Sequence, residues 1–483
     1  MLFNSIDFIV FLAVVFVLYW NFLSKTKNVQ NIFLTIASFT FYIFWDWRFS
    51  LLLIFSVLLN YYGAILVENQ SSSRSRSLFL TAVVVLNIVV LGFFKYYNFF
   101  ANSASVLFSK FGLSIDVPTL SIILPIGISF YTFHGLSYII DVYYKRIKTH
   151  RNLVDYTLFV TYFPLLVAGP IERATHLLPQ LKVKREFSYI QCVQGLELIL
   201  WGFLKKLVIA DSLAPFVSTI FDNSGSHNST ALILGAIAFA FQVYGDFSGY
   251  TDIARGVSRL FGIELLLNFS YPYFSRSIPE FWSRWHISLS SWLNDYVFMP
   301  IALKYRDYGK HGIFLAVFST FLVSGIWHGA AWHFIAWGAF HGLLYLPFIY
   351  KGKGLRSMFG KRTENYSLRD LPSILLTFSL VLIGYIMFRA NSLTDAMIYY
   401  KGLFTGSLME VPNIQGKTTL LMIFVFILIL LIIEFKGRHT TNPISHIANI
   451  KSRFVRWSLY SLLIFVIGMY MNNNVSAFIY FQF

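Results

Sequence analysis

Cysteine is almost absent from this chain of 483 residues, because Cys192 is the only one. A single thiol excludes an intramolecular disulfide, a CxxC redox pair and a zinc site built from cysteines. Charged side chains are scarce as well, since they make up 12% of the residues, where soluble domains carry roughly 25%. So few charges cannot cover the surface of a water-soluble fold, which excludes an ordinary cytosolic enzyme.

Acidic residues are the rarer charged class, since 22 Asp and Glu accompany 38 Lys and Arg and leave a formal net charge of +16. A basic excess is typical of proteins that bind nucleic acid and of membrane proteins with basic cytoplasmic loops. The sequence also lacks a P-loop, a dinucleotide-binding glycine pattern and the spacing of a zinc-protease helix. We therefore expect chemistry without a bound metal or cofactor.

Apolar residues dominate the chain, with 57% hydrophobic residues, 19% aromatic residues and a mean hydropathy of +0.63. A helix that crosses a bilayer needs about 20 apolar residues. The sequence predicts an all-α polytopic membrane protein with about 11–13 transmembrane helices, plus re-entrant and interfacial helices, around a central cavity. The strong spans are residues 6–23, 30–45, 49–67, 77–94, 121–141, 191–210, 231–250, 312–330, 332–350, 372–390, 418–435 and 457–471.

The distribution of Lys and Arg predicts the orientation of these spans. If the N-terminus lies outside the cell and the spans alternate, one set of loops carries 30 of the 38 basic residues and faces the cytoplasm. The sequence therefore predicts a multi-pass protein of the cell membrane with both termini outside, and the basic excess requires no nucleic-acid partner. The cytoplasmic loops in this scheme are 24–30, 68–76, 143–190, 251–311, 351–370 and 436–456.

A shorter apolar stretch, 153–169, does not fit as a crossing segment because basic residues precede and follow it. Pro164 lies within it, so we expect a re-entrant or broken helix. Irregular backbone at membrane depth is tolerated only where protein buries it or where it lines a cavity. Residues 1–23 carry Asp7 and no basic segment before it, which indicates a retained first span.

Histidines within apolar segments are the first functional candidates, because ionisable groups in a membrane are costly. His328 lies between small residues, with Trp327 and Trp332 near it. These tryptophans predict a tight apolar wall, and burial there keeps an imidazole neutral, the state that a general base requires. The alternative is a structural histidine that bonds across helices.

His286 lies in a segment where aromatic residues recur at helical spacing, with Trp282, Trp285 and Trp292 on one face and Arg284 on the other. This pattern predicts a helix at the membrane interface or along a cavity. An interfacial anchor is the alternative role for His286. Three further histidines are expected to make structural hydrogen bonds between helices: His134, His333 and His341.

The segment 244–252 ends a predicted span with two carboxylates and two glycines. It predicts either a loop after a helix, capped by Asp, or a polar wall of the reaction cavity. The residues expected to line that wall are Asp246, Ser248, Tyr250 and Asp252.

These residues and several others resemble the membrane-bound O-acyltransferase family, in particular its bacterial polysaccharide branch, which is typified by the membrane subunit of alginate O-acetylation. The motifs are moderate individually and specific in this order. One departure is His134, where many relatives are expected to carry glutamine. The matching segments are 124–133, 136–138, Asp141, 168–171, 246–252, 281–289, 325–329, 387–390 and 478–483.

The resemblance implies one transmembrane domain over 1–483, with N-terminal helices in 1–120, a catalytic core in 121–350 and C-terminal helices in 351–483. It implies that His328 is the essential histidine and His286 a second functional one. It further implies an acyl thioester donor such as acetyl-CoA as co-substrate. The acyl group, acetyl in the first instance, would pass to an extracytoplasmic acetyltransferase partner or polysaccharide acceptor.

Two alternatives stay open at this point. Within the family, the chain could transfer D-alanine to teichoic acids, although its length and the 478–483 tail argue against this. From a different class, it could be a proton-coupled transporter whose histidines relay protons. Transporters of that kind are built from repeats with paired broken helices, and we find no such repeat in the sequence.

Overall fold

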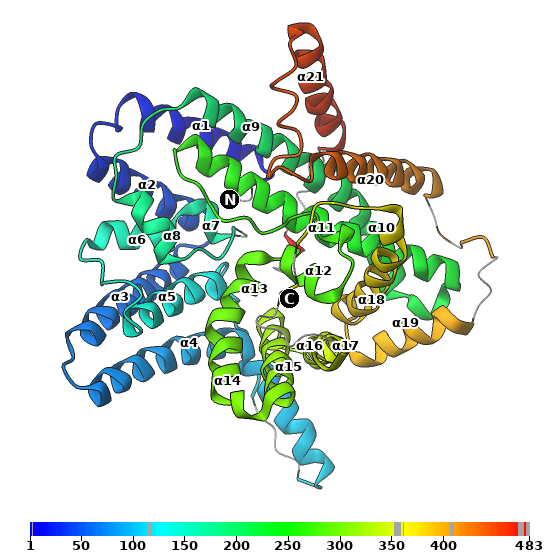
Figure 1. The fold of residues 1–483 in the computed structure, drawn as a ribbon, viewed down its shortest axis with the longest axis horizontal. Coiled ribbons are helices and arrows are strands. Elements are labelled where there is room, and N and C mark those ends of the chain that lie inside the picture. Colours follow the sequence, from blue (N-terminus) through cyan, green and yellow to red (C-terminus); the bar gives the residue numbers. More distant parts are fainter. Residues whose placement is uncertain are drawn as a thin grey trace. The chain divides into compact units, whose positions relative to one another are not determined.

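The computed structural model describes residues 1–483 except 2, 114–117, 168, 352–358, 361, 406–409, 413, 415, 472–477 and 480–483. All regular secondary structure in these described residues is helical, which confirms the predicted all-α class (Figure 1). Contacts divide the chain into two compact units, 1–191 with 258–266, and 192–257 with 267–483. The predicted boundaries at residues 120 and 350 stay predictions.

Within the described part of the chain, seven helices are long and apolar enough to cross a membrane, and each coincides with a predicted span. The other predicted spans contain shorter helices, so the total of about 11–13 crossings stays a prediction. Two of the seven segments include a short 3-10 turn before the helix. The seven are Arg48–Asn69 (α3), Ser73–Lys110 (α4), Ser229–Leu260 (α11), Arg306–His328 (with α15, Gly309–His328), Leu368–Arg389 (with α18, Leu371–Arg389), Lys417–Gly437 (α20) and Arg453–Tyr470 (α21).

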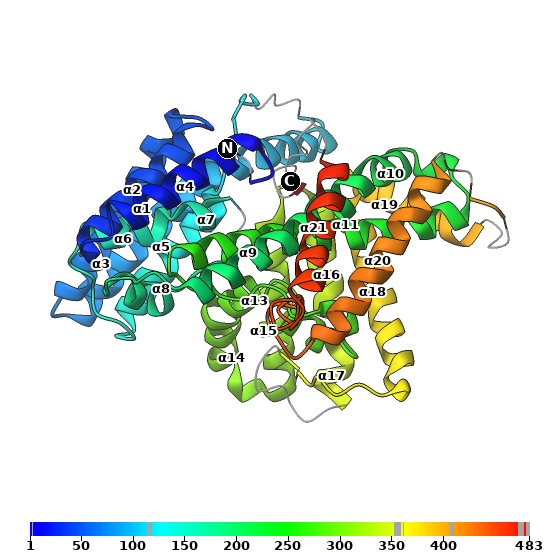
Figure 2. The same cartoon turned by 90° about the horizontal axis from the view of Figure 1, so that it is seen from above.

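The first unit is built around α3, which packs against α4 and α5 (Figures 1 and 2). Gly63 permits this approach, because a Cβ there would meet the side chains of Val83 and Ile139. Asn60 and Asn87 join α3 to α4 by two buried amide hydrogen bonds of 3.0 and 3.1 Å. The remaining helices of this unit are Ile6–Asn21 (α1), Lys27–Ile43 (α2), Ile128–Tyr143 (α5), Leu153–Thr161 (α6), Phe163–Leu166 (α7) and Ala174–Leu181 (α8).

The stretch 153–169 is a broken helix, as the sequence predicted. Asn152 caps the start of α6, and the helix stops at Thr161. Tyr162 is not helical, and Pro164 lies in the first turn of α7, where its missing N–H costs nothing. Whether this segment re-enters the membrane without crossing it stays a prediction.

The second unit carries the predicted site residues. Its best-packed pair is α15 and α16, seen in Figures 1 and 2. Gly325 and Gly338 meet there, and a Cβ on either would clash with a backbone carbonyl of the other helix. Helices of this unit not yet given are Tyr189–Phe203 (α9), Leu204–Ala210 (η1, a π-helix), Asp211–Asp222 (α10), Ile278–Arg284 (α12), Ile287–Leu293 (α13), Asn294–Phe298 (η4, a π-helix), Met299–Lys304 (α14), Trp332–Leu343 (α16), Leu346–Lys351 (α17) and Leu393–Thr405 (α19).

Candidate active site

His328 is the last residue of α15 and is buried. Its imidazole is surrounded by aromatic rings from three helices. The ring centroids of Trp327, Trp337 and Phe388 lie 4.9, 5.0 and 5.1 Å from that of His328. Trp337 belongs to α16 and Phe388 to α18. Trp327, one of the two tryptophans from which the wall was predicted, is therefore present, and Trp337 and Phe388 from two other helices complete the wall.

His286 lies in a break between two short helices, α12 and α13, each of seven residues. The predicted continuous helix through Trp282 and Trp292 is wrong, because His286 has left-handed backbone angles, φ 44° and ψ 54°. Trp285 ends α12 with extended backbone angles, and the left-handed angles of His286, which are uncommon for residues other than glycine, turn the chain into α13. The imidazole is buried and contacts Phe247, whose ring centroid lies 4.6 Å away.

Trp327 brings the two histidines together. Its ring centroid lies 4.9 Å from that of His328 and 5.8 Å from that of His286. Both histidines are thus in the same aromatic cluster of the second unit, although they are 42 positions apart in the sequence. This shared contact is the central geometric feature of the candidate site.

The four polar residues of the 244–252 segment do not lie in a loop, because α11 continues to Leu260. The prediction of a loop after a helix, capped by Asp, is therefore wrong. Gly245 and Gly249 let α11 approach the end of α9 and the π-helix η1, since a Cβ on either would meet backbone atoms there. The carboxylates of Asp246 and Asp252 face two lysines across this contact instead of capping a helix.

Two buried lysines of η1 neutralise these carboxylates. The Nζ atom of Lys205 lies 2.5 Å from Asp252, and that of Lys206 lies 2.6 Å from Asp246. Lys206 also pairs with Asp211 at 2.8 Å. Buried charges of opposite sign that pair in this way avoid the cost of an isolated charge in an apolar interior. Asp246 and Asp252 thus have partners on the protein itself.

Asp246 and Tyr250 also hold part of the C-terminal tail. The backbone N–H of Ile479 donates to Asp246 at 2.7 Å, and the ring of Phe478 packs on Tyr250 and Phe247. Phe247 in turn contacts His286. Residues 480–483 of the matching tail motif lie outside the described part of the chain, as does Ala168 of the earlier motif.

Ser248 and Trp285 are both buried, as expected for cavity candidates. The hydroxyl of Ser248 has no hydrogen-bond partner among the described residues. Trp285 packs on Phe281, Phe269 and Tyr385, with ring centroids between 5.0 and 5.7 Å apart. Trp332 differs from the prediction, because 57% of its surface is exposed, whereas the sequence placed it in a tight apolar wall.

Arg284 is fully buried and paired with carboxylates and backbone oxygens, and its place in the substrate cavity stays a prediction. Its guanidinium lies 3.0 Å from Glu280 and 3.2 Å from Glu364. It also donates to the backbone oxygens of Ser270 and Thr363. These hydrogen bonds connect α12 to the segment that contains Thr363 and Glu364, before α18.

The histidines expected to be structural are all buried. His134, in the first unit, accepts a hydrogen bond of 3.0 Å from the backbone N–H of Glu172. His341 lies on α16 between Trp282 and Trp337, with ring centroids 5.1 and 5.0 Å away. His333 lies in the first turn of α16, beside Phe334. The contacts of His333 and His341 are with aromatic rings, so the hydrogen bonds between helices predicted for these two residues stay predictions.

Sequence reasoning missed Trp337, Phe388 and Phe247 as neighbours of the histidines, because each lies on a different helix from the histidine that it contacts. It also left Lys205 and Lys206 without partners, although lysines inside an apolar span are a signal to search for buried carboxylates. Among the described residues, no group of three or more His, Cys, Asp or Glu side chains could hold a metal ion.

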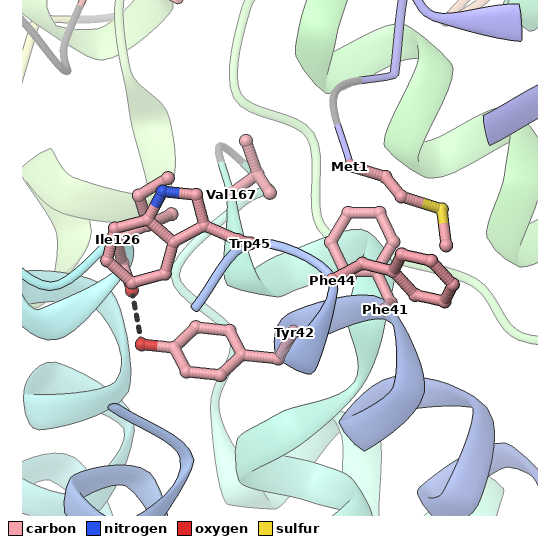
Figure 3. A pocket seen from close by; sticks show the side chains of 7 residues that line it. All are labelled: Met1, Phe41, Tyr42, Phe44, Trp45, Ile126 and Val167. Atoms are coloured by element: carbon pink, nitrogen blue, oxygen red, sulfur yellow. Dashed lines mark hydrogen bonds between the residues drawn. The ribbon is translucent and has the colours of Figure 1, made fainter. Parts of the chain in front are cut away.

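An apolar pocket of about 150 Å³ lies in the first unit. Among its lining residues, Tyr42 donates its hydroxyl to the backbone oxygen of Ile126 at 3.0 Å (Figure 3). Aromatic and aliphatic side chains form its lining, which includes no histidine or carboxylate. The lining residues are Met1, Phe41, Tyr42, Phe44, Trp45, Ile126 and Val167.

The chain matches known proteins over most of its length. Residues 8–367 match the MBOAT, membrane-bound O-acyltransferase family. The probable alginate O-acetylase AlgI of Azotobacter vinelandii is 40% identical over 385 residues, which cover 78% of this chain and 73% of that protein. The probable alginate O-acetylase AlgI of Pseudomonas aeruginosa is 36% identical over 448 residues, or 90% and 81% of the two chains.

A third relative acts on a different polymer. The peptidoglycan O-acetyltransferase of Helicobacter pylori is 32% identical over 442 residues, which cover 83% of this chain and 80% of that protein. The family match spans both histidines and most of the helices described above. The chain therefore belongs to the membrane-bound O-acyltransferase family, and it is a multi-pass membrane enzyme that transfers acyl groups to hydroxyl groups.

Proposed function

We propose that this enzyme moves an acetyl group from cytosolic acetyl-CoA to the hydroxyl groups of an extracytoplasmic polysaccharide, through a partner protein outside the membrane. The single observation that carries the proposal is the contact of His328 and His286 with the same indole, that of Trp327. Two relatives are named as alginate O-acetylases and one as a peptidoglycan O-acetyltransferase, which supports acetyl as the acyl group.

His328 acts as the general base in this proposal. Its imidazole takes the proton of the acceptor hydroxyl while that oxygen attacks the thioester carbonyl. The tetrahedral intermediate then expels the thiolate, which receives the proton from the imidazolium and leaves as the free thiol. A thiol has a pKa near roughly 8–9, so it leaves readily and the hydroxyl needs most of the help. The aromatic rings around His328 exclude water that would hydrolyse the thioester.

His286 stabilises the negative charge that develops on the carbonyl oxygen, by donating a hydrogen bond from its ring. Its burial beside Phe247 supports this role, because a donor held in a dry site acts more strongly than one in water. A hydrogen bond of this kind needs no net charge on the ring.

Basic cytoplasmic loops attract the phosphates of the donor. The predicted loop 251–311, which begins within the last turns of α11, offers less unpaired positive charge to these phosphates than its composition suggests. Four of its basic residues pair with carboxylates: Arg255 with Asp252, Arg259 with Glu264, and Arg276 and Arg284 with Glu280.

The donor and the orientation can be tested together. Proteoliposomes with the full chain receive radiolabelled acetyl-CoA on one side only, and base-labile label on a polysaccharide acceptor and its partner protein is counted. We expect transfer when acetyl-CoA meets the basic loops, and none from a D-alanyl carrier-protein thioester. Transfer from the D-alanyl thioester alone would favour teichoic acid modification, and transfer from the opposite side would overturn the orientation with both termini outside.

A further inference from the structure

The left-handed turn at His286 needs a support that its own helices do not provide. A residue at the start of a helix usually caps it, because the first N–H groups have no partner within the helix. Ser, Thr, Asp and Asn serve this role with a side-chain oxygen. The cap position of α13 is His286, whose side chain makes no capping hydrogen bond.

Asn268, which lies outside α12 and α13, takes over the capping. Its backbone oxygen accepts from the N–H of Ile287 at 2.9 Å. Its side-chain oxygen accepts from both the N–H and the hydroxyl of Ser288, at 3.2 and 2.5 Å. The first two N–H groups of α13 are therefore bound by one residue, which is itself completely buried.

The segment that begins with Asn268 also fixes the other side of the turn. Ser270 donates its N–H to the backbone oxygen of Arg284 at 3.0 Å and accepts from the Arg284 side chain at 3.1 Å. Phe269 lies between Asn268 and Ser270 in the chain, and its ring packs on Phe247 with centroids 5.0 Å apart. Phe247 is the ring that contacts His286. The segment thus holds the backbone on both sides of His286 and supports the wall of its imidazole.

We propose that Asn268 is a positioning residue of the active site, which caps α13 in place of His286 and fixes the His286 ring against Phe247 and Trp327. The left-handed conformation is unfavourable for histidine and persists only where neighbouring groups enforce it. In this arrangement Asn268 binds the first N–H groups of α13, and the His286 ring packs against Phe247 and Trp327. The inference rests on the role proposed above for His286.

Activity is the first test, in membranes that contain the full chain, its partner and acetyl-CoA. We expect Asn268→Ala to lower kcat by on the order of 10²-fold with little change in the KM for acetyl-CoA, because it displaces a reacting group rather than a binding one. Ser288→Ala removes one of the three hydrogen bonds and should lower kcat by roughly 5-fold to 10-fold. This milder variant keeps the proposal testable if Asn268→Ala does not fold.

Ser277→Ala is the matched control, because Ser277 caps the neighbouring helix α12 through one side-chain hydrogen bond to the N–H of Glu280. We expect its kcat to stay within about twofold of the wild type. A loss equal to that of Ser288→Ala would show that any weakened cap in this region lowers activity. That result would overturn a specific role for Asn268.

A double-mutant cycle with His286→Ala separates positioning from other effects. If Asn268 acts through His286, Asn268→Ala causes no further loss of kcat in the His286→Ala background. A further loss of the full size would overturn the proposal.

Full activity of His286→Ala would refute the catalytic role proposed for His286. Whether Asn268 supports the left-handed turn at His286 could still be measured. The thermal stability of His286→Gly then decides, since glycine adopts the left-handed turn without support. Asn268→Ala should lower the melting temperature less in that background than in the wild type. An equal decrease in both backgrounds would overturn the positioning inference by itself.

Discussion

His328 and His286 lie in one aromatic cluster, yet the protein holds them in opposite ways. His328 ends a regular helix of 20 residues and is placed by rings from α15, α16 and α18. His286 lies in a break between two helices of seven residues, and polar bonds from Asn268 fix the backbone beside it. Apolar packing therefore positions one histidine, and a network of hydrogen bonds positions the other.

This difference indicates that the two sites tolerate change differently. Aromatic packing is spread over many weak contacts, so the place of His328 depends on the volume and shape of its neighbours. A strained backbone turn depends on a few directional bonds, so the place of His286 depends on the presence of particular acceptors. Variants that remove side-chain volume should therefore affect the position of His328, and variants that relieve backbone strain should affect the position of His286.

The largest effect is expected for His328→Ala. Loss of the general base should lower the rate of acyl transfer by about 10²-fold to 10⁴-fold while the protein still folds. His333→Gln is the matched control, because His333 is also a buried histidine at one end of the α15–α16 connection. Turnover of labelled acetyl-CoA is the measurement, and full activity of a folded His328→Ala enzyme would exclude the base assignment.

The second largest effect is expected for Phe388→Ala, which removes part of the aromatic packing around His328. The ring of Phe388 packs on His328, Trp337 and Phe334, with centroids 5.1 to 5.3 Å apart. Its removal leaves a cavity that should cost about 3–5 kcal/mol of folding free energy, together with a loss of turnover. Phe404→Ala is the control, since Phe404 is 88% exposed.

Thermal unfolding in detergent measures both phenylalanine variants. A Phe388→Ala protein as stable as Phe404→Ala would mean that packing does not hold His328 in place.

Alanine and glycine at the two histidines should have opposite orders of stability. At His286, with φ 44°, glycine should be more stable than alanine by about 1 kcal/mol, because alanine keeps the left-handed strain. At His328, within the last turn of α15, glycine should be less stable than alanine by about 0.5–1 kcal/mol. Melting temperatures of the four variants check this, and the same order at both positions would contradict the comparison.

The smallest effect concerns His176, a histidine outside the membrane-spanning segments. Its hydrogen bond with Glu172, at 2.8 Å, raises the pKa of His176, whereas burial raises the pKa of Glu172. Because the pKa of His176 is raised on folding, its stabilising contribution is complete below about pH 6.5. That contribution is lost as the pH rises through the raised value.

We therefore expect the melting temperature of the wild type to exceed that of His176→Gln by a small amount near pH 6, and by less near pH 8. The difference is small because His176 is partly exposed, so solvent screens the pair. Glu264 also lies near enough to raise the pKa of His176. Glu264→Gln should therefore make the difference in melting temperature smaller still. A difference that grows with pH would contradict this sign.

Local pattern was sufficient to predict the class of the molecule. Runs of apolar residues predicted the seven long helices, because each run is a property of consecutive residues. Pro164 together with basic flanks predicted the broken helix over 153–169. The two histidines were found in the same way, since an ionisable group between tryptophans and small residues is visible without a structure.

Only the tertiary structure showed that α11 continues and that the helix at His286 is broken, because residue spacing does not encode contacts with other segments. The α11 helix continues through Asp246 and Asp252, because Lys205 and Lys206 on another helix neutralise both carboxylates. The helical periodicity around His286 gave no sign of the break, because the support for the turn comes from Asn268, 18 residues away.

The sequence alone thus determined the membrane class, the helical fold and the family resemblance, and it nominated both histidines, since these follow from composition and local order. Only the tertiary structure decided that Trp327 lies within contact of both histidines, that Trp337 and Phe388 enclose one, and that a left-handed turn presents the other. The physical reason is that most of these contacts join different helices, whose relative positions are set by burial and close packing and not by local sequence.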